Sequence, residues 1–141
     1  MLRSVVVALL GGYAVAVIAV TVFPLTARSA SWTMFHYVPF EVDASSFVLN
    51  VLMFVPYGLL VPLIWPVADR YRRLAGHAVA ASAGIEAVQL ILGLTLDSRR
   101  TVDVNDLIAN TAGALLGLLV LRLAVPHREH RAVLSPPARA D

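Results

Sequence analysis

The chain has 141 residues, of which 59% are apolar and 14% are charged, and its mean hydropathy is +0.78. Soluble domains average about 45–50% apolar and about 25% charged residues, and a small domain cannot bury such an apolar excess because its surface-to-volume ratio is high. The absence of cysteine excludes disulfide frameworks, thiolate zinc sites and cysteine nucleophiles. The net charge of +2 rests on eleven arginines, which mostly flank apolar runs. Membrane topology therefore explains these arginines better than nucleic-acid binding does.

Four apolar stretches are long enough to cross a membrane as helices. A hydrocarbon core about 30 Å thick takes about 20 helical residues. The first stretch exceeds the apolar core of a signal peptide, so we predict a retained helix, with cleavage near residues 26–30 as the alternative. We predict an all-α, polytopic four-helix membrane domain over residues 1–125 and a polar tail over 126–141, which we expect to be disordered and cytoplasmic. The four predicted spans are 5–25, 46–65, 74–95 and 107–124.

The arginine positions predict the orientation of these spans. With the N-terminus inside, eight arginines fall on the inner side and three on the outer side. Because cytoplasmic segments are enriched in Arg and Lys, we expect both termini in the cytoplasm. The loops over 26–45 and 96–106 are then outside, and the aromatic residues between 32 and 40 lie at the outer interface.

Polar and small residues recur at helical spacing in and next to three of the spans. We call these sets the polar seams, and their members are Asn50, Phe54, Tyr57 and Val61; Ser82, Glu86, Gln89 and Gly93; and Asp103, Asp106, Asn110, Gly113 and Gly117. Polar side chains are costly in hydrocarbon, so we expect the seams to face one another. From the helical rise of about 1.5 Å per residue, the polar groups of all three converge in the outer half of the membrane.

This convergence is the predicted ligand site. Arg99 and Arg100 in the second outer loop would hold a phosphate or carboxylate, and the amides would hydrogen-bond the rest of the ligand. The predicted ligand-binding residues are Asn50, Glu86, Gln89, Arg99, Arg100, Asp103, Asp106 and Asn110. No metal site and no cofactor is predicted, since the histidines show no ligand spacing with carboxylates.

Simpler interpretations stay open beside the ligand site. The spacing Gly113-x-x-x-Gly117 is typical of close helix packing, and the two span asparagines could serve as interhelical hydrogen bonds. Glu86 differs, because a lone carboxyl at that depth either takes up a proton or pairs with a cation. A purely structural ion pair between Glu86 and Arg99 or Arg100 is therefore an alternative to a binding role.

Five short motifs occur in order along the chain from about residue 5 to residue 124. They are Val38-Pro39-Phe40, the run from Asn50 to Gly58, Glu86-Ala87-Val88-Gln89, Arg100-x-x-Asp103-x-x-Asp106, and Asn110-Thr111-Ala112-Gly113 with Gly117. In these motifs the chain resembles the VanZ-like family of small bacterial integral membrane proteins. Asn105, directly before Asp106, has no role that the resemblance assigns.

The resemblance implies a multi-pass protein of the bacterial cell membrane. The family's name comes from a member associated with resistance to the glycopeptide teicoplanin, so antibiotic resistance is an expectation that the resemblance adds. An outward-facing cluster is compatible with glycopeptides, lipid-linked wall precursors or anionic lipid headgroups. We expect membrane lipids as partners, no nucleic acid, and an oligomeric state that the sequence leaves open.

Three hypotheses of function follow. The first is a non-enzymatic cell-envelope protein that binds an anionic or lipid-linked molecule. The second is a small intramembrane enzyme that uses Glu86, or the pair Asp103 and Asp106, as general acid or base on a lipid or wall precursor. Against the second stands the absence of a Ser-His-Asp set, an HExxH motif or a phosphate-binding Gly loop. The third is a carrier or pore built by oligomerisation, which only the intramembrane polar residues support.

Overall fold

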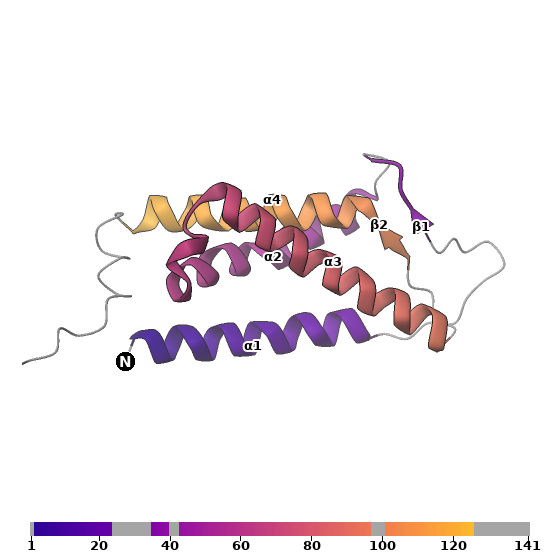
Figure 1. The fold of residues 1–141 in the computed structure, drawn as a ribbon, viewed down its shortest axis with the longest axis horizontal. Coiled ribbons are helices and arrows are strands. Elements are labelled where there is room, and N and C mark those ends of the chain that lie inside the picture. The colour runs from indigo at the N-terminus through magenta and orange to yellow at the C-terminus, as the bar shows by residue number, and fades with distance from the viewer. Residues whose placement is uncertain (1, 24–34, 40–42, 97–100, 126–141) are drawn as a thin grey trace, which may run out of the picture.

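A computed structural model describes residues 2–23, 35–39, 43–96 and 101–125, and it shows a bundle of four long helices (Figure 1). All four are long and apolar enough to span a membrane. The predicted four-helix membrane fold is thereby confirmed, and every helix boundary lies within three residues of its predicted position. The helices are α1 (Leu2–Val22), α2 (Ala44–Ile64), α3 (Tyr71–Thr95) and α4 (Val104–Ala124).

The helices alternate in direction, so the start of α1 and the end of α4 lie at the same end of the bundle (Figure 1). A short 3-10 helix, η1 (Pro66–Ala68), joins α2 to α3 at that end. At the opposite end, β1 (Phe35–His36) pairs in parallel with β2 (Val102–Asp103). This pairing was not predicted, because a two-residue strand is too short to give a recognisable alternation of polar and apolar residues.

Charge is distributed unequally between the two ends among the described residues. We call the end with η1 the arginine end, since it carries Arg3, Arg70, Arg72, Arg73 and Arg122. We call the end with the two strands the carboxylate end, since it carries Asp43, Glu86, Asp103 and Asp106. A chain whose arginines gather at one end of a membrane bundle has the charge pattern that orients membrane proteins.

Aspartates cap the two helices that begin at the carboxylate end. Asp43 accepts hydrogen bonds from the Ser45 hydroxyl at 2.6 Å and from the Ser46 backbone N–H at 2.9 Å, and these bonds hold the pKa of Asp43 below its usual range. Asp103 precedes α4 and accepts from the Asn105 backbone N–H at 2.8 Å. Such caps satisfy N–H groups that have no partner within the helix. They explain why α2 and α4 begin two to three residues before the apolar stretches.

Helices α2 and α4 form the closest contact in the bundle, and glycines permit it. A Cβ atom on Gly58 would overlap the carbonyl of Ala114, and one on Gly113 would overlap the carbonyl of Val51. A Cβ on Gly117 would overlap the carbonyl of Val55 in the same way. The predicted packing role of the Gly113-x-x-x-Gly117 spacing is therefore confirmed.

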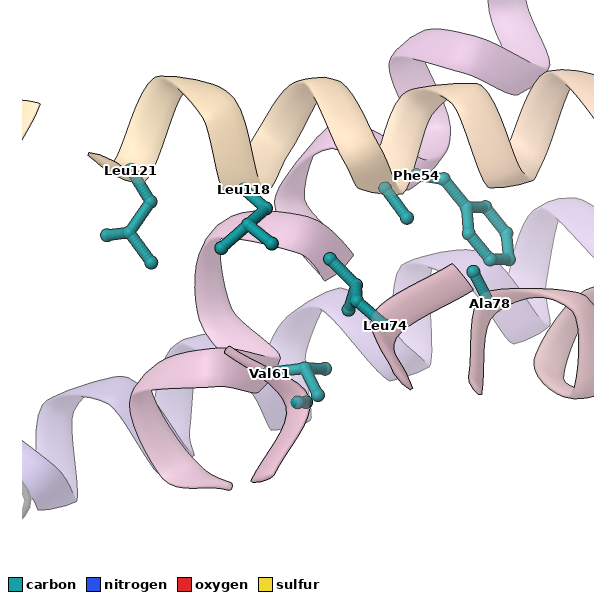
Figure 2. Close-up of a cluster of buried hydrophobic side chains, with 8 residues drawn as sticks. Phe54, Val61, Leu74, Ala78, Leu118 and Leu121 are labelled. Atoms are coloured by element: carbon teal, nitrogen blue, oxygen red, sulfur yellow. The ribbon is translucent and has the colours of Figure 1, made fainter. Parts of the chain in front are cut away.

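The apolar core fills the half of the bundle toward the arginine end. Figure 2 shows its side chains, which come from α2, η1, α3 and α4. Those labelled are Phe54, Val61, Leu74, Ala78, Leu118 and Leu121. Helix α1 contributes less, because Val6 and Thr21 are the only buried side chains among those described in it. The other half of the bundle contains Glu86, Asp103 and Asp106 of the polar seams.

Candidate functional site

A pocket of about 350 Å³ lies at the carboxylate end, with walls from all four helices and from β2. We call it the polar pocket. One part of its wall is polar and includes Asn50, Glu86, Gln89, Asp103 and Asp106. The hydroxyl-bearing residues Thr21, Ser46 and Thr101 add to this part, and Val20, Leu49, Met53 and Ile85 supply the apolar part.

Glu86 is the most buried carboxyl of the polar pocket, with an exposed fraction of 5%. Its Oε2 accepts a hydrogen bond from the backbone N–H of Asp103 at 3.1 Å. The carboxyls of Asp106 and Asp103 lie close enough to Glu86 that negative charges on them would repel a charge on Glu86. A buried carboxyl facing two others is a costly arrangement for a membrane bundle to keep.

Asp106 lies in the first turn of α4 and accepts a hydrogen bond from the Asn50 side-chain amide of α2. This bond crosses the interface between the two most closely packed helices. It fixes the Asp106 carboxyl at the wall of the polar pocket and directs the Asn50 side chain toward the same space. The first turn of α4 is also the turn in which a helix dipole stabilises a carboxylate.

A second network, beside the pocket, joins β1 to the start of α4. The Asn105 side-chain amide donates to Oδ1 of Asp103 at 2.9 Å and to the backbone carbonyl of Val38 at 3.0 Å. His36 Nδ1 lies 3.2 Å from the other oxygen of Asp103, so it donates there when it carries a proton. Asn105 and His36 thus contact the Asp103 carboxyl, while the Asp103 backbone N–H bonds to Glu86. Asp103 is in this way both a wall of the pocket and the cap of α4.

Asn110 lies on the same seam of α4 but does not line the polar pocket. Its side-chain amide donates to the Ser82 hydroxyl of α3 at 2.8 Å, and both side chains are buried. The carbonyl oxygen of the Asn110 side chain has no hydrogen-bond partner among the described residues. This pair is a polar crosslink one helical turn deeper than the Asp106 carboxyl.

The structure brings five of the eight predicted ligand-binding residues together around one pocket, namely Asn50, Glu86, Gln89, Asp103 and Asp106. Asn110 is in the crosslink, and Arg99 and Arg100 lie outside the described residues. His36 and Asn105 were missed, although they stand beside predicted motifs. Asn105 falls between two seam positions, and His36 comes two residues before Val38. Adjacency to these motifs was the signal that could have marked both residues.

This arrangement is suited to hydrogen bonding with an organic headgroup. Carboxylates accept hydrogen bonds, and amides and hydroxyls both donate and accept them. A ligand rich in hydroxyl or amino groups would find partners on the polar part of the wall, and its apolar part would lie against Val20, Leu49, Met53 and Ile85. A small set of convergent polar groups beside an apolar wall is the usual composition of a small-molecule site.

Comparison with known proteins identifies the family of the chain. Residues 10–125 match the model of the family described as VanZ/LLP1, and this range includes all of α2, α3 and α4 and most of α1. No curated protein matches the chain. No solved structure matches it either. Since the match covers most of its length, the four-helix membrane protein belongs to the VanZ/LLP1 family.

Proposed function

We propose that this protein binds the headgroup of an anionic or lipid-linked cell-envelope molecule in the polar pocket, with the carboxylate end facing the outside of a bacterial cell membrane. The single observation that carries the proposal is the grouping of Glu86, Asp106 and Asp103 in one pocket with an apolar wall. Carboxyls that repel one another in a membrane bundle cost stability, and a partner with hydrogen-bond donors offsets that cost.

The amphiphilic character of the ligand follows from the two parts of the wall. The sugar hydroxyls or amino groups of a lipid-linked precursor would bond to Glu86, Asp106 and Gln89, while Leu49 and Met53 would contact its apolar part. Arg99 and Arg100 directly precede Thr101, which lines the pocket. In this proposal they hold a phosphate of the same molecule at the rim.

The orientation rests on charge. All described arginines lie at the arginine end, which we therefore place in the cytoplasm. A glycopeptide antibiotic would meet the protein from the other side, so a contribution to resistance belongs to the same proposal.

The test is an analysis of the lipids that co-purify with the protein. Wild type should retain a lipid-linked molecule that Glu86→Gln and Asp106→Asn lose, since each change removes a charge and keeps the volume. Asp43→Asn is the matched control, because Asp43 is an exposed carboxyl at the same end that does not line the pocket, and asparagine still caps a helix. Identical lipid profiles in all four proteins would refute the proposal.

Melting temperatures of the same variants distinguish a ligand site from a structural ion pair. Glu86→Gln should melt at or above the wild-type temperature in detergent, because the charged groups near Glu86 among the described residues are the carboxyls of Asp103 and Asp106. If Glu86 instead anchors an ion pair, the same change strands a buried arginine at a cost of about 3–5 kcal/mol. A marked loss that Glu86→Gln with Arg100→Gln restores would overturn the ligand-site interpretation.

A second candidate function is an intramembrane enzyme on the same class of molecule. The observation that favours it is that Glu86 and Asp106 line one pocket and have different hydrogen-bond partners, so that they could act as acid and base. Incubation of the purified protein with envelope lipids distinguishes the two functions. Turnover of one lipid by wild type and not by Glu86→Gln supports the enzyme, whereas retention without chemical change supports the binding protein.

A further inference from the structure

The arginine end carries a second hollow, which the proposed ligand site does not use. Arg70, Tyr71, Arg72 and Arg73 line about 400 Å³ at the start of α3. The three arginines are exposed, and within the described residues none of their guanidinium groups has an ion-pair partner. Three positive charges therefore face one hollow without compensation from the described part of the chain.

The carboxyl that is adjacent in sequence, that of Asp69, is already engaged with Arg122. Asp69 is buried, and the Arg122 guanidinium donates to its backbone carbonyl and lies 3.3 Å from its Oδ1. The same guanidinium lies 4.4 Å from the centre of the Tyr71 ring. Arg122 and Asp69 thus neutralise each other, and Tyr71 is held between Arg122 and the hollow. The charge of Arg70, Arg72 and Arg73 is left for a partner outside the bundle.

This hollow lies at the level of lipid headgroups. The turn from Trp65 to Arg70 joins two membrane-spanning helices, so it must lie at a membrane interface. Trp65 and Tyr71 are both exposed, as expected of aromatic residues at that depth. Arginine side chains there extend toward the phosphate layer.

The backbone at the start of α3 adds to the positive field. Arg70 is the N-cap residue and provides no side-chain hydrogen bond to the helix, and the first turn contains no acidic residue. The first N–H groups of a helix lack intrahelical partners and carry a partial positive charge. Guanidinium groups beside them can bind a phosphate in bidentate fashion.

From these observations we infer that Arg70, Arg72 and Arg73 form a docking surface for the phosphate of an anionic phospholipid, whose acyl chains lie against Trp65. The inference is independent of the proposed function, because it concerns the opposite end of the bundle and none of the polar-pocket residues. If the proposed function also holds, the protein has a headgroup site at each end of the bundle, one lined by carboxyls and the other by arginines.

Trp65 lies five residues before Arg70, at the same end of the bundle, and provides a fluorescent probe for lipids at this end. The chain has two tryptophans, so Trp32→Phe leaves Trp65 as the single fluorophore. In that background, the protein is reconstituted into two kinds of phosphatidylcholine vesicle. One contains brominated phosphatidylglycerol and the other contains brominated phosphatidylcholine. Brominated acyl chains quench the fluorescence of a nearby tryptophan. We expect brominated phosphatidylglycerol to quench Trp65 with about fivefold or greater preference. The preference should fall by up to about fivefold in Arg72→Gln and vanish in the variant with all three arginines changed to Gln.

The controls make each outcome decisive. Arg3→Gln removes an exposed arginine at the same end and away from the hollow, so it should leave the preference unchanged. Equal losses of the phosphatidylglycerol preference in Arg3→Gln and Arg72→Gln would show that diffuse surface charge causes it, and would overturn the inference. A preference that persists in the triple variant, or that is absent from wild type, would overturn it as well. Millimolar inorganic phosphate should act no differently from potassium chloride of equal ionic strength. Selective cancellation by phosphate would mean that a free phosphate, and not a lipid, occupies the hollow.

Discussion

Replacing Gly113 by alanine should weaken the interface between α2 and α4, whereas the same replacement at Gly84 should not. A Cβ on Gly113 would overlap the Val51 carbonyl and lie 3.1 Å from the Phe54 Cβ. Neither group is the end of a flexible side chain, so the helices must separate to make room. Gly84 is exposed in α3 and has no atom within 4 Å of the position that a Cβ would take.

For this reason we expect Gly113→Ala to lower the stability of the bundle and Gly84→Ala to raise it. Overpacking a well-packed interior by one methyl group costs about 1–3 kcal/mol. Alanine in a helix is also favoured over glycine by about 0.5–1 kcal/mol, which sets the expected gain at Gly84 and offsets part of the loss at Gly113. Gly113→Ala should therefore lose up to about 2.5 kcal/mol of stability relative to wild type. Adding Gly117→Ala, one turn along the same face, should cost less than the sum of the two changes because the first already displaces α2.

Unfolding in mixed micelles with increasing denaturing detergent measures this difference. The helices stay inserted in such an experiment, so the transition reports mainly on contacts between helices. Equal midpoints for Gly113→Ala and Gly84→Ala would refute the close approach of α2 and α4. A lowered midpoint in Gly113→Ala alone, with helical content unchanged, is the expected result.

Three further predictions concern the carboxylate end and the orientation. Asn105→Leu should lower the free energy of unfolding by about 1–3 kcal/mol, because it removes the side-chain amide that donates to the Val38 carbonyl and to Asp103. Hydrogen exchange of the backbone amides at residues 35–39 should become faster. Unchanged exchange would argue against the network. Ser82→Ala should lower the free energy of unfolding in detergent by about 0.6–2 kcal/mol, because it leaves the Asn110 amide unpaired. Adding Asn110→Leu to the same chain should recover part of this loss. An equal loss in the single and double variants would contradict a crosslink. A single cysteine at Tyr37 should react with an impermeant label on intact cells, and one at Arg72 only after permeabilisation; the reverse pattern would overturn the N-inside orientation.

The sequence was sufficient to predict the four helices and five of the eight polar residues in the pocket wall. Span length and hydropathy determine the helices, because few other folds can accommodate so many apolar residues in a chain of this size. Helical periodicity placed Glu86 and Gln89 on one face and Asp103 and Asp106 on another, and both faces meet at the polar pocket. That agreement reflects the cost of polar groups in hydrocarbon.

The relative heights of the helices could not be predicted in the same way. Counting from the end of α3 places Glu86 about 13 Å from Thr95. The structure nevertheless has Glu86 accept a hydrogen bond from Asp103, which directly precedes α4. Helix α3 thus extends past the start of α4, and tilt and offset of this kind depend on packing between helices. For the same reason, sequence spacing could not show that Asn110 would meet Ser82 below the pocket.

The roles of Asn105 and His36 depend on contacts between distant segments. His36 and Asp103 are 67 residues apart and meet only because β1 pairs with β2. Short extended pairings carry no periodic signal, and Asn105 lies outside the seams because its side chain points toward β1. The roles of such residues can be recognised only when the pairing of β1 with β2 is known.

The sparse packing of α1 bears on how a ligand reaches the polar pocket. Val20 and Thr21 of α1 form one wall of that pocket, while the glycine contacts close the bundle between α2 and α4. Separating α1 from its neighbours uncovers few buried side chains, so it is the least costly displacement in the bundle. If the proposed function holds, an amphiphile that diffuses within the bilayer would enter by that lateral route without leaving the lipid phase. Tethering α1 to α3 by engineered cysteines would then slow ligand exchange and leave the pocket intact.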